Sequence, residues 1–174
     1  MKTYLRIGII VIVVATFVYL GFKVGHNIQK KIDSAERLET IPDFEFQSLE
    51  DDIFTKDSLK ANMPTLLIYF NSTCDFCQHE AKSIVEHLED FKNVQLLFIS
   101  EEPKHSIKTF AVDYKLYNQQ NITFLHDNTH KFTDRFDANT IPYLLVYNEK
   151  GKLIKRHKGQ LNAKGILKLL HQKL

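Results

Sequence analysis

The sequence predicts an α/β fold: a mixed, mostly parallel central sheet flanked by helices and preceded by one N-terminal transmembrane helix. Three observations support this prediction. The chain has 174 residues, 44% of them hydrophobic, which suits one domain plus a short appendage. After residue 40, apolar β-rich runs alternate with amphipathic helical patterns. Near the N-terminus, sixteen residues from Ile7 to Phe22 carry no charge.

The N-terminal segment is predicted to be an uncleaved membrane anchor over residues 1–23, followed by a solvated linker over residues 24–40. At about 1.5 Å per residue, sixteen helical residues reach roughly 24 Å. Snorkelling of Arg6 and Lys23 extends this span towards the roughly 30 Å hydrocarbon core. A cleaved signal peptide is the alternative, but no small-x-small cleavage site follows the run. We therefore expect this helix to contact the lipid bilayer.

The charge distribution argues against a nucleic-acid partner. Residues 1–40 hold six Lys/Arg against three Asp/Glu, whereas residues 41–174 hold 17 against 18. The second part is nearly neutral and lacks the basic field that nucleic-acid binding needs. With only two cysteines, the chain cannot form a multi-disulfide scaffold or a site of four thiolates.

Residues 41–174 are predicted to form one domain, whose strands and helices follow from hydrophobic periodicity. The strand order of β-α-β-α-β requires crossovers and parallel pairing, and a final strand pair adds an antiparallel edge. The expected elements are a hairpin over 44–54, strands over Thr65–Phe70, Val94–Ile99, Ile122–Leu125, Tyr143–Tyr147 and Leu153–His157, and helices over Cys77–Phe91, 104–117, Lys131–Phe136 and Ala163–Leu174.

The strongest chemical signal is Cys74-Asp75-Phe76-Cys77, at the junction of a buried strand and a helix. Two intervening residues let both sulfurs meet across one helical turn and form an exchangeable disulfide. The helix N-terminus stabilises a thiolate on Cys74. We therefore predict that Cys74 is the exposed nucleophile and Cys77 the buried resolving thiol, which attacks the mixed disulfide. The Cys74–Cys77 disulfide would be the redox-active group, with no other cofactor and no resident metal.

Three other interpretations compete with thiol exchange. A copper- or zinc-handling module could use the two cysteines and a histidine, although no second cysteine pair exists and the eight histidines are scattered. A purely structural disulfide is disfavoured because so short a loop removes little entropy from the unfolded chain. A thiol-inert interaction domain is the third alternative.

A second signal is Ile141-Pro142, directly before the predicted strand Tyr143–Tyr147. A cis bond here would turn the Ile141 backbone towards the dithiol, where its polar groups could pair with an extended substrate. We predict that Ile141 and Pro142 bind substrate. The alternative is that this proline is an ordinary stop at the entrance of a strand.

Together these residues resemble the thioredoxin superfamily, and more narrowly the membrane-anchored thiol–disulfide oxidoreductases of the TlpA/ResA type. The resemblance covers nearly all of residues 41–174, from IPDF at its start to NEKGKLIKRHKG near its end, and implies a thioredoxin-like fold. Glu80 completes the pattern C-x-x-C-x-x-E, which implies proton transfer to and from Cys77. The alternative for Glu80 is an acid favoured by the helix dipole. Ile68 stands where thioredoxins themselves keep an Asp.

The two residues inside the dithiol, Asp75 and Phe76, are predicted to tune its redox potential, since the proline usual there is absent. The negative charge of Asp75 opposes thiolate formation on Cys74. A less stabilised thiolate makes a less oxidising couple, so we predict a reductase, with a disulfide-forming oxidase as the alternative. A peroxiredoxin is disfavoured because its pattern P-x-x-x-T-x-x-C requires Thr where this chain has Asn71.

The resemblance also implies a place in the cell and two kinds of partner. The protein would be single-pass in the cytoplasmic membrane, with its catalytic domain on the periplasmic or extracytoplasmic side. Its substrates would be disulfide-containing exported proteins, including cytochrome c precursors. A membrane electron donor would be needed to return the dithiol to its reduced state in this oxidising compartment.

Overall fold

The computed structural model describes residues 2–171, except for the side chains of residues 2–14 and 27. The first element is helix α1 (Lys2–Leu38), and the chain divides into two compact units between Arg37 and Leu38. Within the described residues, no helix has the length and apolar character needed to cross a membrane. Residues 7–14 of the expected anchor lie outside the described side chains, so the anchor over residues 1–23 stays a prediction.

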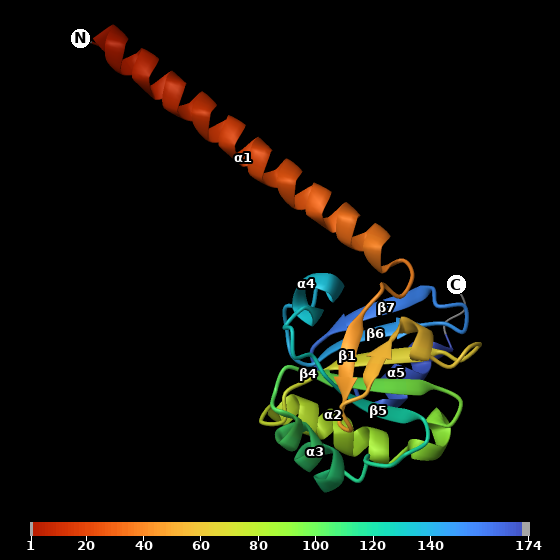
Figure 1. Ribbon diagram of the computed structural model, residues 1–174. Coiled ribbons are helices and arrows are strands. Elements are labelled where there is room, and N and C mark those ends of the chain that lie inside the picture. The colour runs from red at the N-terminus through yellow and green to blue at the C-terminus, as the bar shows by residue number, and fades with distance from the viewer. Residues whose placement is uncertain (1, 172–174) are drawn as a thin grey trace. The chain divides into compact units, whose positions relative to one another are not determined.

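The second unit is built on a seven-stranded sheet with the order β2-β1-β5-β4-β3-β6-β7 (Figure 1). The inner strands β3 and β4 are buried at every position because helices or loops cover both faces. The strands are β1 (Glu45–Ser48), β2 (Ile53–Thr55), β3 (Thr65–Tyr69), β4 (Gln95–Ser100), β5 (Ile122–His126), β6 (Tyr143–Tyr147) and β7 (Leu153–Lys158). The predicted hairpin and all five further strands are therefore confirmed.

The sheet is mixed, and the prediction that it is mostly parallel is wrong. Only the pairs β3–β4 and β4–β5 are parallel, while the other four are antiparallel. The direction of β6 decides this difference, because β6 begins with Tyr143 opposite Tyr69, at the carboxyl end of β3. The intervening helix α4 (Phe132–Phe136) spans only about 7.5 Å. It is too short to carry the chain back along a strand of roughly 17 Å.

Three helices cover one face of the sheet: α2 (Asp75–Val85), α3 (Lys104–Asp113) and α5 (Ala163–Leu170). They pack on strand residues with even numbers, such as Ile68 and Phe98. Two short 3₁₀ helices, η1 (Lys56–Ser58) and η2 (Leu88–Phe91), complete the helical elements of this unit. The predicted helix Cys77–Phe91 thus becomes α2 followed by η2. The predicted end of the last helix, residues 172–174, lies outside the described part.

The opposite face is covered by α4 and by the segment that leads into β1 (Figure 1). Here the odd-numbered strand residues meet Leu38, Phe44 and Phe132, and the ring of Tyr69 stacks on Phe132 with centroids 4.7 Å apart. The expectation of helices on both faces is therefore confirmed. The alternation along β3 also means that Phe70 and the chain beyond it continue towards α2, on the other face from Tyr69.

Candidate active site

The dithiol lies at the start of α2, where the chain leaves β3 through residues 71–73. Cys74 is the N-cap residue and adopts an extended conformation, and its carbonyl accepts the first helical hydrogen bond from the Gln78 N–H (3.0 Å). Both cysteines are free thiols, with Cys74 partly exposed and Cys77 3% exposed. Only Cys74 can therefore meet a large substrate without a change in the fold.

Burial sets the chemistry of the second thiol. Desolvation raises the pKa of Cys77 far above its ordinary value, and the neighbouring groups Cys74 and Glu80 raise it further. A hydrogen bond from the backbone of Asn71 opposes this rise without cancelling it. Cys77 therefore remains a thiol until a base removes its proton, since only the thiolate attacks a disulfide.

Glu80 is a buried carboxyl group, 1% exposed, one helical turn after Cys77. Its Oε2 accepts a hydrogen bond from the Leu161 N–H (2.9 Å), and its Oε1 has no partner in the described part of the chain. Burial raises the pKa of Glu80 to about 8, although the hydrogen bond from Leu161 acts in the opposite direction. At neutral pH most molecules therefore hold a proton on Glu80 beside Cys77. Its role in catalysis stays a prediction.

Pro142 and the dithiol loop leave the sheet at the same edge, because Tyr143 pairs with Tyr69. The Ile141–Pro142 peptide bond is cis, at the position that the resemblance implied. Pro142 is buried, whereas Ile141 is 39% exposed. The structure thus places both predicted substrate-binding residues at the edge from which Cys74 departs.

The two residues between the cysteines face solvent. Phe76 is 61% exposed, and Asp75 is an exposed acid in the first turn of α2. A hollow of about 340 Å³ lies between α2 and α3, and its lining residues are Ser72, Gln78, His105, Ser106, Thr109, Phe110, Asp113 and Tyr114. The reactive end of the domain therefore combines exposed apolar surface with a polar recess.

The histidine closest in sequence to the dithiol is engaged locally, as the Nδ1 atom of His79 lies 2.7 Å from the Asp75 carbonyl oxygen. Among the described residues, no three His, Cys, Asp or Glu side chains lie together in a way that could hold a metal ion.

Sequence reasoning missed two partners of the site. The Leu161 N–H contacts Glu80 across 81 positions of sequence, and no sequence signal pointed to it. Glu102 contacts Ser72, two residues before Cys74. The acidic pair Glu101-Glu102 that follows a buried strand is a signal that could have indicated Glu102, because the ends of neighbouring parallel strands meet at one edge.

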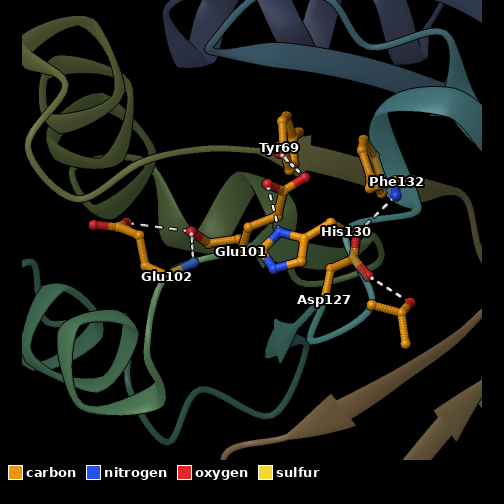
Figure 2. Close-up of polar contacts among 8 residues, drawn as sticks. Tyr69, Glu101, Glu102, Asp127, His130 and Phe132 are labelled. Atoms are coloured by element: carbon orange, nitrogen blue, oxygen red, sulfur yellow. Dashed lines mark hydrogen bonds and ion pairs between the residues drawn. The ribbon is translucent and has the colours of Figure 1, made fainter.

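A separate polar cluster lies on the other face of the sheet (Figure 2). The Tyr69 hydroxyl donates a hydrogen bond to Glu101 (2.6 Å), whose second oxygen lies 2.9 Å from the His130 Nδ1. Partial burial alone would raise the pKa of Glu101, but the bonds from Tyr69 and His130 outweigh burial and lower it. The same hydrogen bond and the charge of Glu101 raise the pKa of His130. Asp127 holds the connecting loop by accepting the Phe132 N–H (2.7 Å).

The Glu101–His130 pair predicts a stability contribution with a defined pH window. Because folding raises the pKa of His130, the pair contributes its full stability below the unfolded pKa of 6.5. This contribution is lost as the pH rises through the pKa of the folded protein. The lowered pKa of Glu101 gives stability that is present above 4.5 and lost at lower pH. We expect His130→Ala to lower the urea midpoint more at pH 5.5 than at pH 8.5. An equal loss at both values would contradict this expectation, and the exposed His105→Ala serves as control.

The fold and the dithiol at the start of α2 define a class: thioredoxin-like proteins of the thiol–disulfide oxidoreductase kind. Residues 38–156 match the family model described as the AhpC/TSA family, and the chain belongs to that family.

Individual relatives agree with this assignment. A thioredoxin-like protein of Haemophilus influenzae is 25% identical over 115 residues, which are 66% of this chain and 66% of that protein. A secreted disulfide oxidoreductase of Mycobacterium tuberculosis, homologous to E. coli DsbE, has a similar structure (TM-score 0.63, 21% identity, 78% of this chain and 96% of that one). StoA from Bacillus subtilis is also similar (TM-score 0.58, 18% identity, 75% and 98%). At these identities the two solved structures share the fold.

Proposed function

We propose that the chain is a membrane-anchored thiol–disulfide oxidoreductase that reduces disulfides in exported proteins through Cys74 and Cys77. The observation that carries this proposal is the asymmetry of the two thiols. Cys74 is partly exposed at the start of α2, whereas Cys77 is buried one turn inside, beside Glu80. Two-step exchange needs this arrangement, because the first thiol must reach the substrate and the second must reach only the first.

The reaction transfers two electrons from the dithiol to the substrate. The Cys74 thiolate attacks one sulfur of the substrate disulfide, and the other substrate sulfur leaves and takes up a proton. Cys77 then loses its proton to a base and attacks the Cys74 sulfur, which releases the second substrate thiol and leaves the Cys74–Cys77 disulfide. We assign the base to ionised Glu80, whose pKa of about 8 leaves roughly one molecule in ten ionised at pH 7. When an electron donor reduces the disulfide, the proton returns.

The exposed surface around Cys74 suits a protein substrate. Phe76 and Ile141 offer exposed apolar side chains, and extended substrate backbone could pair with the backbone polar groups of Ile141. The hollow between α2 and α3 provides room for a substrate side chain. Because exposed aromatic and branched side chains recognise unstructured chain without strict sequence preference, we propose a range of disulfide-containing proteins as substrates.

The N-terminal unit is proposed to hold the domain at the outer side of the cytoplasmic membrane. The uncharged run Ile7 to Phe22 supports this proposal, together with the large exposed apolar side chains of Phe17, Tyr19 and Phe22 on α1. In that compartment disulfides form readily. The domain would therefore receive electrons from a membrane donor.

The midpoint potential of the Cys74–Cys77 couple tests the proposal, measured on the full chain in detergent with glutathione or dithiothreitol buffers. A reversible couple near or below roughly −220 mV supports a reductase, whereas about −120 mV would reverse the electron flow and make the protein an oxidant. If no reversible couple exists, the exchange function fails and the metal content of the purified protein becomes the next measurement. Consumption of hydrogen peroxide by the same sample tests for peroxidase chemistry.

Asp75 is expected to keep the couple reducing, because its charge disfavours the thiolate of Cys74. Asp75→His should make the potential less negative by about 30 mV, which corresponds to tenfold in the exchange equilibrium. Asp75→Asn, which removes only the charge, should give a smaller shift in the same direction. Both potentials are measured in the same buffers as the unaltered protein. Unchanged values in both variants would show that Asp75 does not tune the couple.

A further inference from the structure

Ser72 lies two residues before Cys74, in the loop that carries the nucleophile from β3 to α2. All three of its polar groups are engaged. Its N–H donates to Oε2 of Glu102 (2.6 Å) and its hydroxyl donates to Oε1 of the same carboxylate (2.7 Å). Its carbonyl accepts a hydrogen bond from the Gln78 side chain on α2 (2.9 Å). The loop is thus tied at one residue both to the end of β4 and to the helix.

The Glu102 carboxylate is itself held in place by the last residue of β4. The Ser100 hydroxyl, which is buried, donates to Oε2 of Glu102 (3.2 Å) and accepts from the Glu102 N–H (3.2 Å). The register of β3 and β4 brings the two segments together, with the Phe70 N–H donating to the Ile99 carbonyl (3.0 Å). Glu102 is therefore tied by hydrogen bonds to the end of β4 where it meets Ser72.

Two short bonds to one carboxylate are among the stronger contacts that a loop can make. A carboxylate satisfies both Ser72 donors, because it accepts at both oxygens. A glutamine amide in its place could accept the Ser72 N–H at its oxygen and donate from its N–H₂ to the Ser72 hydroxyl, because a hydroxyl also accepts. The position of Cys74 relative to the helix start depends on this loop. A displacement of about 1 Å at a reacting group can cost a hundredfold in rate.

We propose that Glu102 is a positioning residue, which fixes Ser72 and thereby holds the Cys74 sulfur in its reactive place at the N-terminus of α2. This inference rests on the proposed exchange function, because it concerns the reactivity of the same thiol. Glu102 touches neither sulfur in the reaction and acts through Ser72. A purely electrostatic role predicts a faster reaction of Cys74 when the charge of Glu102 is removed, whereas a positioning role predicts a slower reaction when the contacts with Ser72 are lost.

Two substitutions of Glu102 separate these roles. Glu102→Gln removes the charge and can keep both contacts with Ser72, whereas Glu102→Asp keeps the charge and shortens the side chain so that it no longer reaches both donors. We expect Glu102→Asp to slow alkylation of Cys74 by iodoacetamide about tenfold at pH 7, and Glu102→Gln to leave the rate within about twofold of the unaltered protein. Ser72→Ala, which keeps the N–H bond, should slow alkylation about threefold.

The neighbouring acid provides a matched control. Glu101→Gln removes an equal charge one residue away, on the face that holds Tyr69 and His130, and should leave alkylation of Cys74 unchanged. Faster alkylation in Glu102→Gln with no change in Glu102→Asp would overturn the positioning role in favour of a charge effect. Rates within twofold of the unaltered protein in both variants would overturn it as well.

The two proposals fail in distinguishable ways. If the unaltered protein shows no reversible dithiol couple, the exchange function fails, whatever the Glu102 variants do. If the couple is reversible and the alkylation rates do not change, only the positioning role fails. Should the Glu102 variants not fold by circular dichroism, Ser72→Ala decides the matter, and a rate equal to that of the unaltered protein then overturns the inference.

Discussion

We expect Cys74→Ser to slow disulfide exchange severely and Cys77→Ser to stop the reaction at the mixed disulfide. The first variant leaves only Cys77, which is 3% exposed and whose pKa is strongly raised by burial. Its thiolate fraction falls tenfold for each pH unit below its pKa, so we expect exchange to slow at least a hundredfold, as an order-of-magnitude estimate. The second variant keeps the exposed nucleophile but lacks the thiol that resolves the adduct.

Reaction with an aromatic disulfide that releases a coloured thiolate distinguishes the two variants. The unaltered dithiol should release about two equivalents and retain no adduct, because Cys77 displaces the first product. Cys77→Ser should release about one equivalent and keep the other half bound to Cys74, visible by mass. Equal behaviour of the two serine variants would show that the thiols do not have separate roles. A Cys74→Ser chain with undiminished exchange would contradict the proposed nucleophile.

Glu80→Gln is expected to slow the step carried out by Cys77 about hundredfold, the usual range for loss of a general base. The glutamine has nearly the same shape and can still accept the Leu161 N–H, so the packing at the start of α5 is retained. In the unaltered protein this step should accelerate as pH rises towards about 8, where Glu80 ionises. In Glu80→Gln the levelling-off near pH 8 should disappear, and the rate should rise about tenfold per pH unit throughout, because Cys77 then ionises without a neighbouring base. Stopped-flow measurement of the release of the second product, from pH 6 to pH 9, provides the test.

The same variant tests the burial of Glu80 through stability. Its pKa is raised from 4.5 unfolded to about 8 folded, so the unfolded state loses its proton first. Protonated Glu80 therefore makes its full contribution to the free energy of unfolding below pH 4.5, and this contribution is lost as the pH rises through about 8. Within this window the unaltered protein should lose stability relative to Glu80→Gln by about 1.4 kcal/mol per pH unit. Parallel curves of unfolding free energy against pH for the two proteins would contradict a buried, neutral Glu80.

Predictions about single elements succeeded where the signal was local. The run Thr65–Phe70 predicted β3, and the pattern after Cys74 predicted α2, because period and burial are properties of neighbouring residues. The place of the dithiol at the start of a helix followed from the same two elements. The roles of Cys74, Cys77 and Glu80 remain predictions that the variants above address.

Predictions about strand direction failed where the signal was distant. The hydrophobic pattern of a strand carries no information about its direction. The residues of β6 would show the same pattern whether the strand ran parallel or antiparallel to β3. Its orientation depends on which edge of the sheet the chain occupies after β5, and the short helix α4 leaves it at the carboxyl edge. Two of the four antiparallel pairs, β1–β2 and β6–β7, are the hairpin and the edge pair that the sequence predicted, whereas β3–β6 follows from that local connection.

By itself, the sequence determined the α/β class, the order of the elements and the dithiol at a helix start, because each depends on residues within about one helical turn or strand. The tertiary structure alone decided that Glu102 meets Ser72 across 30 positions and that the Leu161 N–H meets Glu80 across 81. Neither contact is marked in the sequence by a periodic pattern or by a characteristic spacing of residues. Both arise because strands and helices distant in the chain end at the same edge of the sheet, where their polar groups must find partners once water is excluded.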